Sequence, residues 1–305
     1  MLRKLAILIL IAAVAGSAAL WLLMVPQTVP PSALVPYTPD IANGRTMFFA
    51  GGCASCHAVP GQEDSSLLGG GGELKSPFGI FHAPNISPDR NDGIGAWSEA
   101  DFVTAMVKGT SPDGSHYYPA FPYTSYQRMS YADVRDLFAY LKTQPPVQGK
   151  AREHELRFPF QFRRTVGIWK FLYVDSKPFQ PDPTKSAQWN RGAYLVNGPG
   201  HCAECHSPRN VLGAVVVNQR FGGGPHLSEE GWVPNITAKR LSEWTEKDFA
   251  YLLETGMSPD GDSVGSSMVL VVRNIGMLSA EDRNAMAAYI KSLPIVEGVV
   301  KPAKN

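Results

Sequence analysis

An uninterrupted apolar run opens the chain, and charged residues are absent from a long stretch after it. Arg3 and Lys4 precede 21 uncharged residues from Leu5 to Val25, and the next charged residue is Asp40. As a helix, such a run spans ~32 Å, enough to cross the hydrocarbon core of a bilayer. We therefore predict a membrane anchor at residues 1–25, with its N-terminus cytoplasmic and the rest of the chain in the periplasm.

A cleaved signal peptide is the alternative interpretation of this run. Ala13-Val14-Ala15 has the form of an Ala-x-Ala cleavage site. The apolar run continues past it to Val25, further than an ordinary signal-peptide core, which favours an uncleaved anchor in the bacterial inner membrane. Both interpretations export the chain. The Pro-rich residues 26–39 are predicted to form an extended tether.

Amphipathic segments after residue 40 predict short helices in two similar sets. In each set one helix leads into a Cys-rich segment, a second follows a tryptophan, and a third begins at a Ser-x-x-Asp capping signal. The helices are expected at 41–49, after Trp97 and from Ser130, and again at 187–196, after Trp244 and from Ser279. Pro145 and Pro294 end the last helix of each set. The glycine run at 69–72 predicts a flexible loop.

The two sets are copies of one unit. Asn85-Ile86 returns as Asn235-Ile236 at an offset of 150 residues, and Trp97 and Ser111 return as Trp244 and Ser258 at an offset of 147. Because the order is the same and the offsets are nearly constant, we predict duplicated domains at 40–145 and 186–297. The period is too long for a solenoid.

Two copies of Cys-x-x-Cys-His carry the candidate chemistry. They read Cys53-Ala-Ser-Cys56-His57 and Cys202-Ala-Glu-Cys205-His206, and they use all four cysteines of the chain. In this motif the cysteines add to the vinyl groups of haem c from one side of a helical turn, and the histidine ligates the iron. We predict two covalently bound haem c groups, held by Cys53, Cys56, Cys202 and Cys205, with His57 and His206 as iron ligands.

Zinc knuckles and a redox-active dithiol are the alternatives for these segments. A structural zinc site needs four nitrogen or sulfur ligands, usually from two half-motifs brought together. Here the segments lie 149 residues apart and each has its own histidine, so two separate haem sites are favoured. No cysteine is left over for a disulfide or a nucleophile.

The charge balance changes between the two units. Residues 146–185 carry a net charge of +4, whereas the first unit carries −4 and residues 186–305 carry −1. The basic stretch is also rich in aromatic residues, so we expect a connector that packs on one or both units. The positive charge of the connector either offsets the negative charge of the first unit, or forms a surface for haem propionates or for an acidic partner. The formal net charge of +1 gives no argument for a nucleic-acid partner. Residues 298–305 are expected to form a tail after the second unit.

Several sequence phrases outside the haem motifs are typical of one family. They include Ala83-Pro84-Asn85-Ile86, Tyr118-Pro119-Ala120-Phe121-Pro122-Tyr123, Leu156-Arg157-Phe158-Pro159-Phe160 and Val264-Gly265-Ser266-Ser267-Met268. With them, residues 40–297 resemble the membrane-bound cytochrome c subunits of periplasmic alcohol, gluconate and aldehyde dehydrogenases. The expected fold is mainly α: two tandem class I cytochrome c-like domains after an N-terminal transmembrane helix. The best-known members have three haem motifs and a C-terminal membrane segment, whereas this chain has two motifs and an N-terminal one.

The resemblance implies methionine as the sixth ligand of each iron, which raises the potential and suits electron transfer. It implies Met129 for the first haem, with Met106 and His116 as alternatives. For the second haem it implies Met268, with Met257 and Met277 as alternatives.

Four further residues recur in both units and are candidates to hydrogen-bond the haem propionates. They are Asn85 and Trp97 in the first unit, and Asn235 and Trp244 in the second. The alternative is that the asparagines form turns and the tryptophans belong to the core.

The resemblance implies an electron carrier rather than an enzyme. Its donor would be the catalytic subunit of a periplasmic dehydrogenase, and its acceptor a quinone, another cytochrome or a terminal oxidase. The alternative is a dihaem enzyme of the peroxidase or thiosulfate-oxidising type with one open iron site. A cysteine-ligated thiosulfate dehydrogenase would need a fifth cysteine, which the chain lacks.

Overall fold

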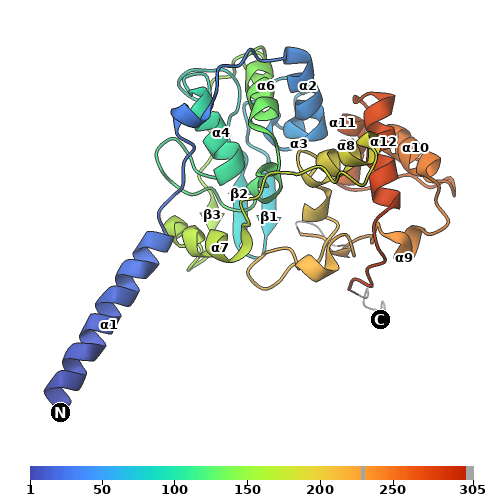
Figure 1. The fold of residues 1–305 in the computed structure, drawn as a ribbon. Helices are drawn as coiled ribbons and strands as arrows, with labels where there is room; N and C mark the ends of the chain where they lie inside the picture. Colours follow the sequence, from blue (N-terminus) through green and yellow to red (C-terminus); the bar gives the residue numbers. More distant parts are fainter. Residues whose placement is uncertain (228–230, 300–305) are drawn as a thin grey trace.

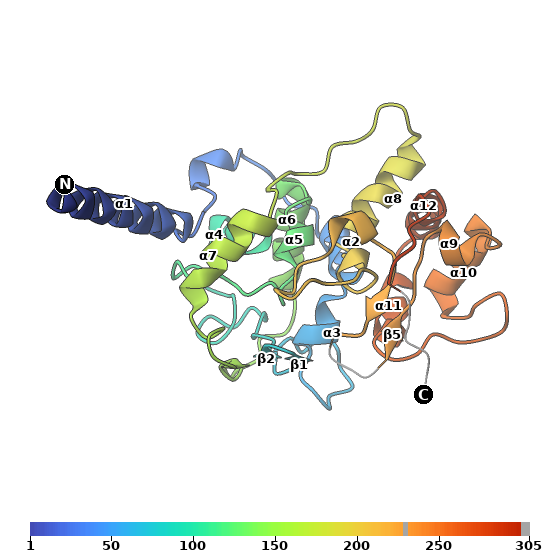
Figure 2. The same cartoon turned by 90° about the horizontal axis from the view of Figure 1, so that it is seen from below.

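The computed structural model describes residues 1–227 and 231–299, so most of the predicted tail at 298–305 lies outside the described residues. A single long helix, α1 (Leu2–Leu23), projects from a body made of two helical units that lie side by side (Figure 1). The first unit lies next to α1 and the second lies further away, an arrangement also visible from below (Figure 2). Each predicted domain boundary falls outside a helix, and the boundaries themselves stay predictions.

Helix α1 has 22 residues, none of them buried against the body. Its length and apolar composition are sufficient to cross a membrane. The Pro-rich segment that follows is extended apart from one 3-10 turn, η1 (Pro31–Ala33). It packs along the first unit: the backbone nitrogen of Val29 donates to Thr104 Oγ1 at 2.9 Å, and Arg135 Nη1 donates to the carbonyl of Val35 at 2.8 Å.

The first unit contains two helices that cross each other, and the first Cys-x-x-Cys-His segment directly follows one of them. Its helices are α2 (Ile41–Ala50), α3 (Cys53–His57), α4 (Glu99–Lys108), α5 (Tyr123–Tyr126) and α6 (Tyr131–Leu141). Ser130 caps α6, as predicted, by accepting from the backbone nitrogen of Asp133. Helices α2 and α6 touch at Gly44, where an added Cβ would lie 2.1 Å from the carbonyl oxygen of Asp136.

The second unit repeats this crossing. Its elements are α8 (Ala187–Asn197), η3 (Cys202–Glu204), η4 (Val217–Gln219), α9 (Ala238–Leu241), α10 (Glu246–Thr255), α11 (Met268–Ile275) and α12 (Ala280–Lys291). Helices α8 and α12 touch at Gly192, where an added Cβ would lie 1.8 Å from the carbonyl oxygen of Ala285. Both crossings need a glycine because backbone lies against backbone. The prediction of a mainly helical chain is confirmed.

Short strands, which the sequence did not predict, tie the connector to the first unit. Strands β1 (Glu73–Ser76), β2 (Gly79–His82) and β3 (Glu155–Leu156) form an antiparallel sheet in the order β1-β2-β3, with Gly79 opposite Leu156. The connector continues through η2 (Arg163–Thr165) and α7 (Val166–Tyr173). Trp169 Nε1 donates to the carbonyl of Leu212 at 2.9 Å, so the connector packs on both units, as expected. In the described part of the second unit, the strands are the pair β4 (Gly224–Pro225) and β5 (Trp232–Val233).

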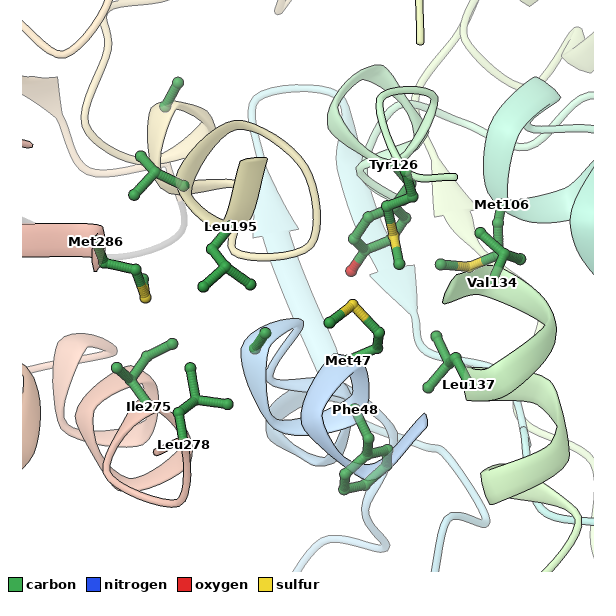
Figure 3. Packing of buried hydrophobic residues seen from close by; sticks show 14 of the residues in the cluster. Met47, Phe48, Met106, Tyr126, Val134, Leu137, Leu195, Ile275, Leu278 and Met286 are labelled. Atoms are coloured by element: carbon green, nitrogen blue, oxygen red, sulfur yellow. The ribbon is translucent and has the colours of Figure 1, made fainter. Parts of the chain in front are cut away.

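One hydrophobic cluster runs through both units. On the side of the first unit, Met47 of α2 faces Tyr126, with Val134 and Leu137 of α6 behind it (Figure 3). On the side of the second unit, Leu195 of α8 and Met286 of α12 converge. Met47 and Leu195 are fully buried. The two units therefore share a core rather than hanging on a flexible connector.

Candidate functional site: the two Cys-x-x-Cys-His segments

Each Cys-x-x-Cys-His segment forms one tight turn at the end of the first helix of its unit. In the first unit, Gly52 adopts a left-handed conformation with φ 55° and starts α3, which contains both cysteines and His57. In the second unit, His201 takes the same place with φ 39° and starts η3. The turn puts the two cysteines of each segment on one side, as thioether attachment requires.

Both histidines are held in the same way by a proline carbonyl. Nδ1 of His57 lies 2.8 Å from the carbonyl oxygen of Pro84, and Nδ1 of His206 lies 2.8 Å from that of Pro234. Since a carbonyl only accepts, Nδ1 carries the proton and Nε2 keeps its lone pair. Burial lowers the pKa of both imidazoles, which keeps them neutral. A neutral imidazole oriented through Nδ1 is the arrangement that a histidine ligand of iron needs.

A glycine completes this support in each unit. The backbone nitrogen of Gly70 donates to the carbonyl of His57 at 2.8 Å, and that of Gly223 donates to the carbonyl of His206 at 2.8 Å. Both glycines have positive φ, 76° and 75°, and leave no room for a Cβ beside Pro84 and Pro234. The prediction of a flexible loop at 69–72 is therefore wrong. These glycines let the chain approach the histidine turn closely and hydrogen-bond to it.

The chemistry of the thiols argues against the zinc and dithiol alternatives. Burial raises the pKa of Cys53 and of Cys202 to about 12. Cys56 and Cys205 have exposed side chains, yet the surrounding protein raises the pKa of each as well. A redox-active dithiol needs the opposite shift, because the thiolate is its reactive form. Among the described residues, no group of three or more His, Cys, Asp or Glu side chains is placed to hold a metal ion.

The two segments lie against each other across the boundary between the units. His201, which precedes Cys202, has its Nε2 3.2 Å from the carbonyl oxygen of Gly51, two residues before Cys53. A second donor of the same unit, Asn274 Nδ2 of α11, donates to Ser55 Oγ, between Cys53 and Cys56, at 3.0 Å. Each Cys-x-x-Cys-His turn is thus hydrogen-bonded to the other unit. His201 is half-buried at this boundary, and its ring centre lies 5.7 Å from that of Tyr126.

Glu204, between Cys202 and Cys205, makes the strongest contact of this boundary. Its Oε1 accepts from Thr124 Oγ1 at 2.7 Å and from Ser125 Oγ at 2.9 Å, both on α5 of the first unit. Its Oε2 pairs with Arg209 Nη2 at 2.7 Å. Burial raises the pKa of Glu204, but Arg209 and the two hydroxyls lower it further, so the net pKa lies below its ordinary value. The carboxylate is therefore ionised and links the second haem-binding turn to the first unit.

The two predicted sulfur ligands lie in different surroundings. Met129 is 1% exposed and belongs to the shared hydrophobic cluster, next to Tyr126. Met268 begins α11 and is half-buried, after a largely exposed loop at 258–267. Their ligation to iron stays a prediction.

The structure also shows where the alternative iron ligands lie. His116 Nε2 lies 3.0 Å from the carbonyl oxygen of Met24 at the end of α1, so the position that would meet an iron is already engaged. Met106 is buried within α4, whereas Met277 is 48% exposed and Met257 is half-buried beside its bridge to Ser263.

The structure places Asn85 and Asn235 in turns. Asn85 Nδ2 donates to the carbonyls of Val147 and Gly149 at 2.7 and 3.0 Å, and Asn235 Nδ2 donates to the carbonyl of Val296 at 2.7 Å. Both amides thus tie the loop after the supporting proline to the chain that follows the last helix. Trp97 and Trp244 pack on the core, and among the described hydrogen bonds none comes from either indole nitrogen. Propionate contacts of these four residues stay predictions.

Pro84, Pro234, Gly70, Gly223 and Glu204 were not singled out from the sequence. The prolines and glycines had a signal, because Pro-Asn-Ile recurs at an offset of 150 and each unit has a Gly-rich run between the motif and this phrase. Glu204 had none, because its partners Thr124 and Ser125 belong to the other unit.

Comparison with known proteins agrees with this geometry. Residues 41–145 match the cytochrome c family. The chain is 44% identical over 286 residues to a dihaem c-type cytochrome of Cereibacter sphaeroides, covering 93% of this chain and 96% of that protein. It is 41% identical over 256 residues to one subunit of the nicotinate dehydrogenase of Pseudomonas putida, covering 83% of this chain and 21% of that protein. The fructose dehydrogenase cytochrome subunit of Gluconobacter japonicus is 34% identical over 274 residues, covering 88% of this chain and 55% of that protein.

Proposed function

Since this chain belongs to the c-type cytochromes, we propose that it holds two haem c groups in tandem cytochrome c domains. It then carries electrons from a periplasmic dehydrogenase to the respiratory chain. An electron-transfer role is what the related cytochrome subunits share. The count of two haems is supported by two complete motifs with matching proline and glycine supports.

The residues of the chain divide the work of holding each group. The thiols of Cys53 and Cys56, and of Cys202 and Cys205, form the covalent attachments, and Nε2 of the adjacent histidine faces the iron. Met129 and Met268 are the proposed sulfur ligands. Bound in this way, haem c supplies a one-electron couple whose potential depends on the axial ligands and on burial.

The contact between the two haem-binding turns is the observation that carries the proposal. His201 reaches the carbonyl of Gly51, Asn274 reaches Ser55, and Glu204 reaches α5. A carrier must keep its redox groups at a fixed short separation, and these three contacts fix one turn against the other.

The partners are proposed from the relatives and from the anchor. Fructose and gluconate dehydrogenases and a quinone-dependent alcohol dehydrogenase have related cytochrome c subunits. We propose that the catalytic subunit of such a dehydrogenase is the electron donor, and that a quinone, another cytochrome or a terminal oxidase is the acceptor. Helix α1 would hold the protein in the inner membrane, with Arg3 and Lys4 cytoplasmic and both units in the periplasm.

Deletion of the protein tests this role. We expect respiration-linked oxidation of one substrate to stop, while its dehydrogenase stays active with an artificial dye, because a dye bypasses a carrier and not a catalyst. The purified protein, reduced with dithionite, should pass electrons to a soluble cytochrome c or to oxidase-containing membranes. Turnover of peroxide or thiosulfate by the purified protein alone, at an enzyme-like rate, would contradict the proposal in favour of a dihaem enzyme.

A further inference from the structure

The end of α1 is fixed rigidly to the first unit. His116 donates through Nε2 to the carbonyl of Met24 at 3.0 Å, and the guanidinium carbon of Arg164 lies 3.6 Å from the ring centre of Trp21. An added Cβ on Gly167 would lie 2.6 Å from Cα of Met24, so the first turn of α7 packs directly against this end of α1. The orientation of the body relative to α1 is therefore set by these contacts.

This attachment fixes the depth of α7 once α1 spans a bilayer. A helix of 22 residues is ~33 Å long, close to the thickness of the hydrocarbon core. Trp21 in its last turns then lies at the lipid headgroups, where tryptophan is enriched in membrane proteins. Because Arg164 stacks on Trp21 and Gly167 touches Met24, the start of α7 lies at the same level. Helix α7 runs across the axis of α1 rather than along it (Figures 1 and 2).

Exposed apolar and basic side chains occur on both sides of the start of α7 in the sequence, and the ring centres of Phe158 and Phe162 lie 6.0 Å apart. Phe158, Phe162, Phe171 and Leu172 are 76%, 54%, 65% and 57% exposed. Arg157 and Arg164 are also exposed and flank the first two phenylalanines in the sequence. We call these six residues the exit surface. The other face of α7 is already used, because Val166 is buried and Trp169 is bonded to Leu212.

We propose that the exit surface lies in the headgroup region of the leaflet on the side of the two units. A helix parallel to the membrane plane, with aromatic residues toward the acyl boundary and arginines among anionic headgroups, is the usual form of an interfacial anchor. The occupant is lipid because the contacts with Trp21 and Met24 hold α7 at the depth of the headgroups. The proposal rests on the proposed membrane anchoring by α1. It makes α7 a second attachment, which holds both haem-binding units in one orientation above the bilayer.

The experiment uses the full-length, haem-loaded protein in nanodiscs that contain phosphatidylglycerol. Single spin labels are placed by Phe162→Cys and Leu172→Cys on the exit surface. Tyr251→Cys, on α10 and 53% exposed, is the matched control, and Ile11→Cys within α1 is the depth reference. Collision with lipid-soluble oxygen is compared with collision with an aqueous nickel chelate. We expect the labels at 162 and 172 to shift from water toward lipid relative to 251, and the label at 11 to be deepest.

Each other outcome overturns the proposal. If the labels at 162 and 172 behave like that at 251 while the label at 11 is in lipid, the anchor holds and the exit surface does not touch the membrane. If they are protected only after the dehydrogenase catalytic subunit is added, the surface belongs to a protein partner. If the label at 11 is itself in water, the anchor proposed for α1 is wrong, and this proposal falls with it.

Discussion

The segment that leads to the proposed ligand Met129 is buried, whereas the loop that leads to the proposed ligand Met268 is exposed. Tyr123, Tyr126 and Met129 are 0%, 6% and 1% exposed, but residues 258–267 lie mostly at the surface. The difference comes from what packs on each copy. The connector covers the first segment, with Lys170 Nζ 4.8 Å from the ring centre of Tyr123, and Glu204 of the second unit bonds to Thr124 and Ser125.

The two copies of the unit are therefore not equivalent as proposed redox sites. The histidine supports are nearly identical, since both use a proline carbonyl and a glycine nitrogen. The sixth-ligand sides differ in burial, and burial disfavours the more highly charged oxidised iron. We therefore expect the haem of the first unit to have the higher potential.

Removal of one haem at a time should give the largest difference in stability between the two units. Cys53→Ala with Cys56→Ala, and Cys202→Ala with Cys205→Ala, should each reduce the intact mass by one haem. The first pair should destabilise the protein more, because Met47, Tyr126 and Met129 pack around its site in the shared cluster. Intact-mass measurement and thermal unfolding by circular dichroism check this. Two haems remaining in either variant would overturn the assignment.

Removal of the Glu204 side chain tests the boundary between the units. Glu204→Ala leaves Arg209 partly buried without its carboxylate and leaves Thr124 and Ser125 without their acceptor. We expect a loss of about 3–5 kcal/mol in the free energy of unfolding, together with slower electron transfer between the haems after flash reduction. Glu243→Ala, at an exposed position, is the control, with an expected loss below about 0.5 kcal/mol. Equal losses in the two variants would show that the boundary does not depend on Glu204.

Replacement of either proposed sulfur ligand should change the spectrum in the same way, but the two replacements should destabilise the protein to different degrees. Met129→Ala should lose about 2–5 kcal/mol in the free energy of unfolding because the side chain is buried, and Met268→Ala should lose less. Each should remove half of the sulfur-to-iron absorbance at the red end of the oxidised spectrum and lower the potential of one haem. Met277→Ala should leave this absorbance unchanged, and a loss in that variant would make Met277 the ligand of the second haem. An unchanged spectrum for Met129→Ala points to Met106 instead, and one for Met268→Ala points to Met257 or Met277.

Binding of carbon monoxide should be the smallest of these effects, and it should differ between the haems of the two units. If both irons have a sulfur ligand, the reduced protein should bind little of the gas. The fraction that binds should be at the second unit, whose ligand loop is exposed and more easily displaced. Optical titration of the wild-type protein and of Met268→Ala distinguishes the sites. Binding that Met129→Ala raises and Met268→Ala leaves unchanged would reverse the comparison.

The helices could be predicted because their signals are local. Ser130 and Ser279 cap α6 and α12, and the helices that lead into the motifs are capped by Asp40 and Ser186, one residue before the predicted starts. The proposed haem-binding residues have an equally local signal, because they lie within five consecutive residues of the sequence.

What the sequence did not predict depends on contacts between distant segments. Strand β3 forms only because β2 offers it an edge, and the loop at 69–72 is ordered by backbone contacts with His57 and Ala83. The contacts of His201, Glu204 and Asn274 depend on how two complete units pack together. No periodicity within either copy encodes that packing.

The reciprocal hold on the two haem-binding turns has a consequence for how the protein is made. Ser55 is 219 residues before its partner Asn274, and Gly51 is 150 residues before His201. As the chain is synthesised from its N-terminus, Cys53 and Cys56 are made long before the residues that later cover their flank. The flank of the first turn is thus uncovered until the second unit has been made, and the boundary forms only then. Maturation of this cytochrome is therefore ordered in time by the distance along the chain between the partners of a single interface.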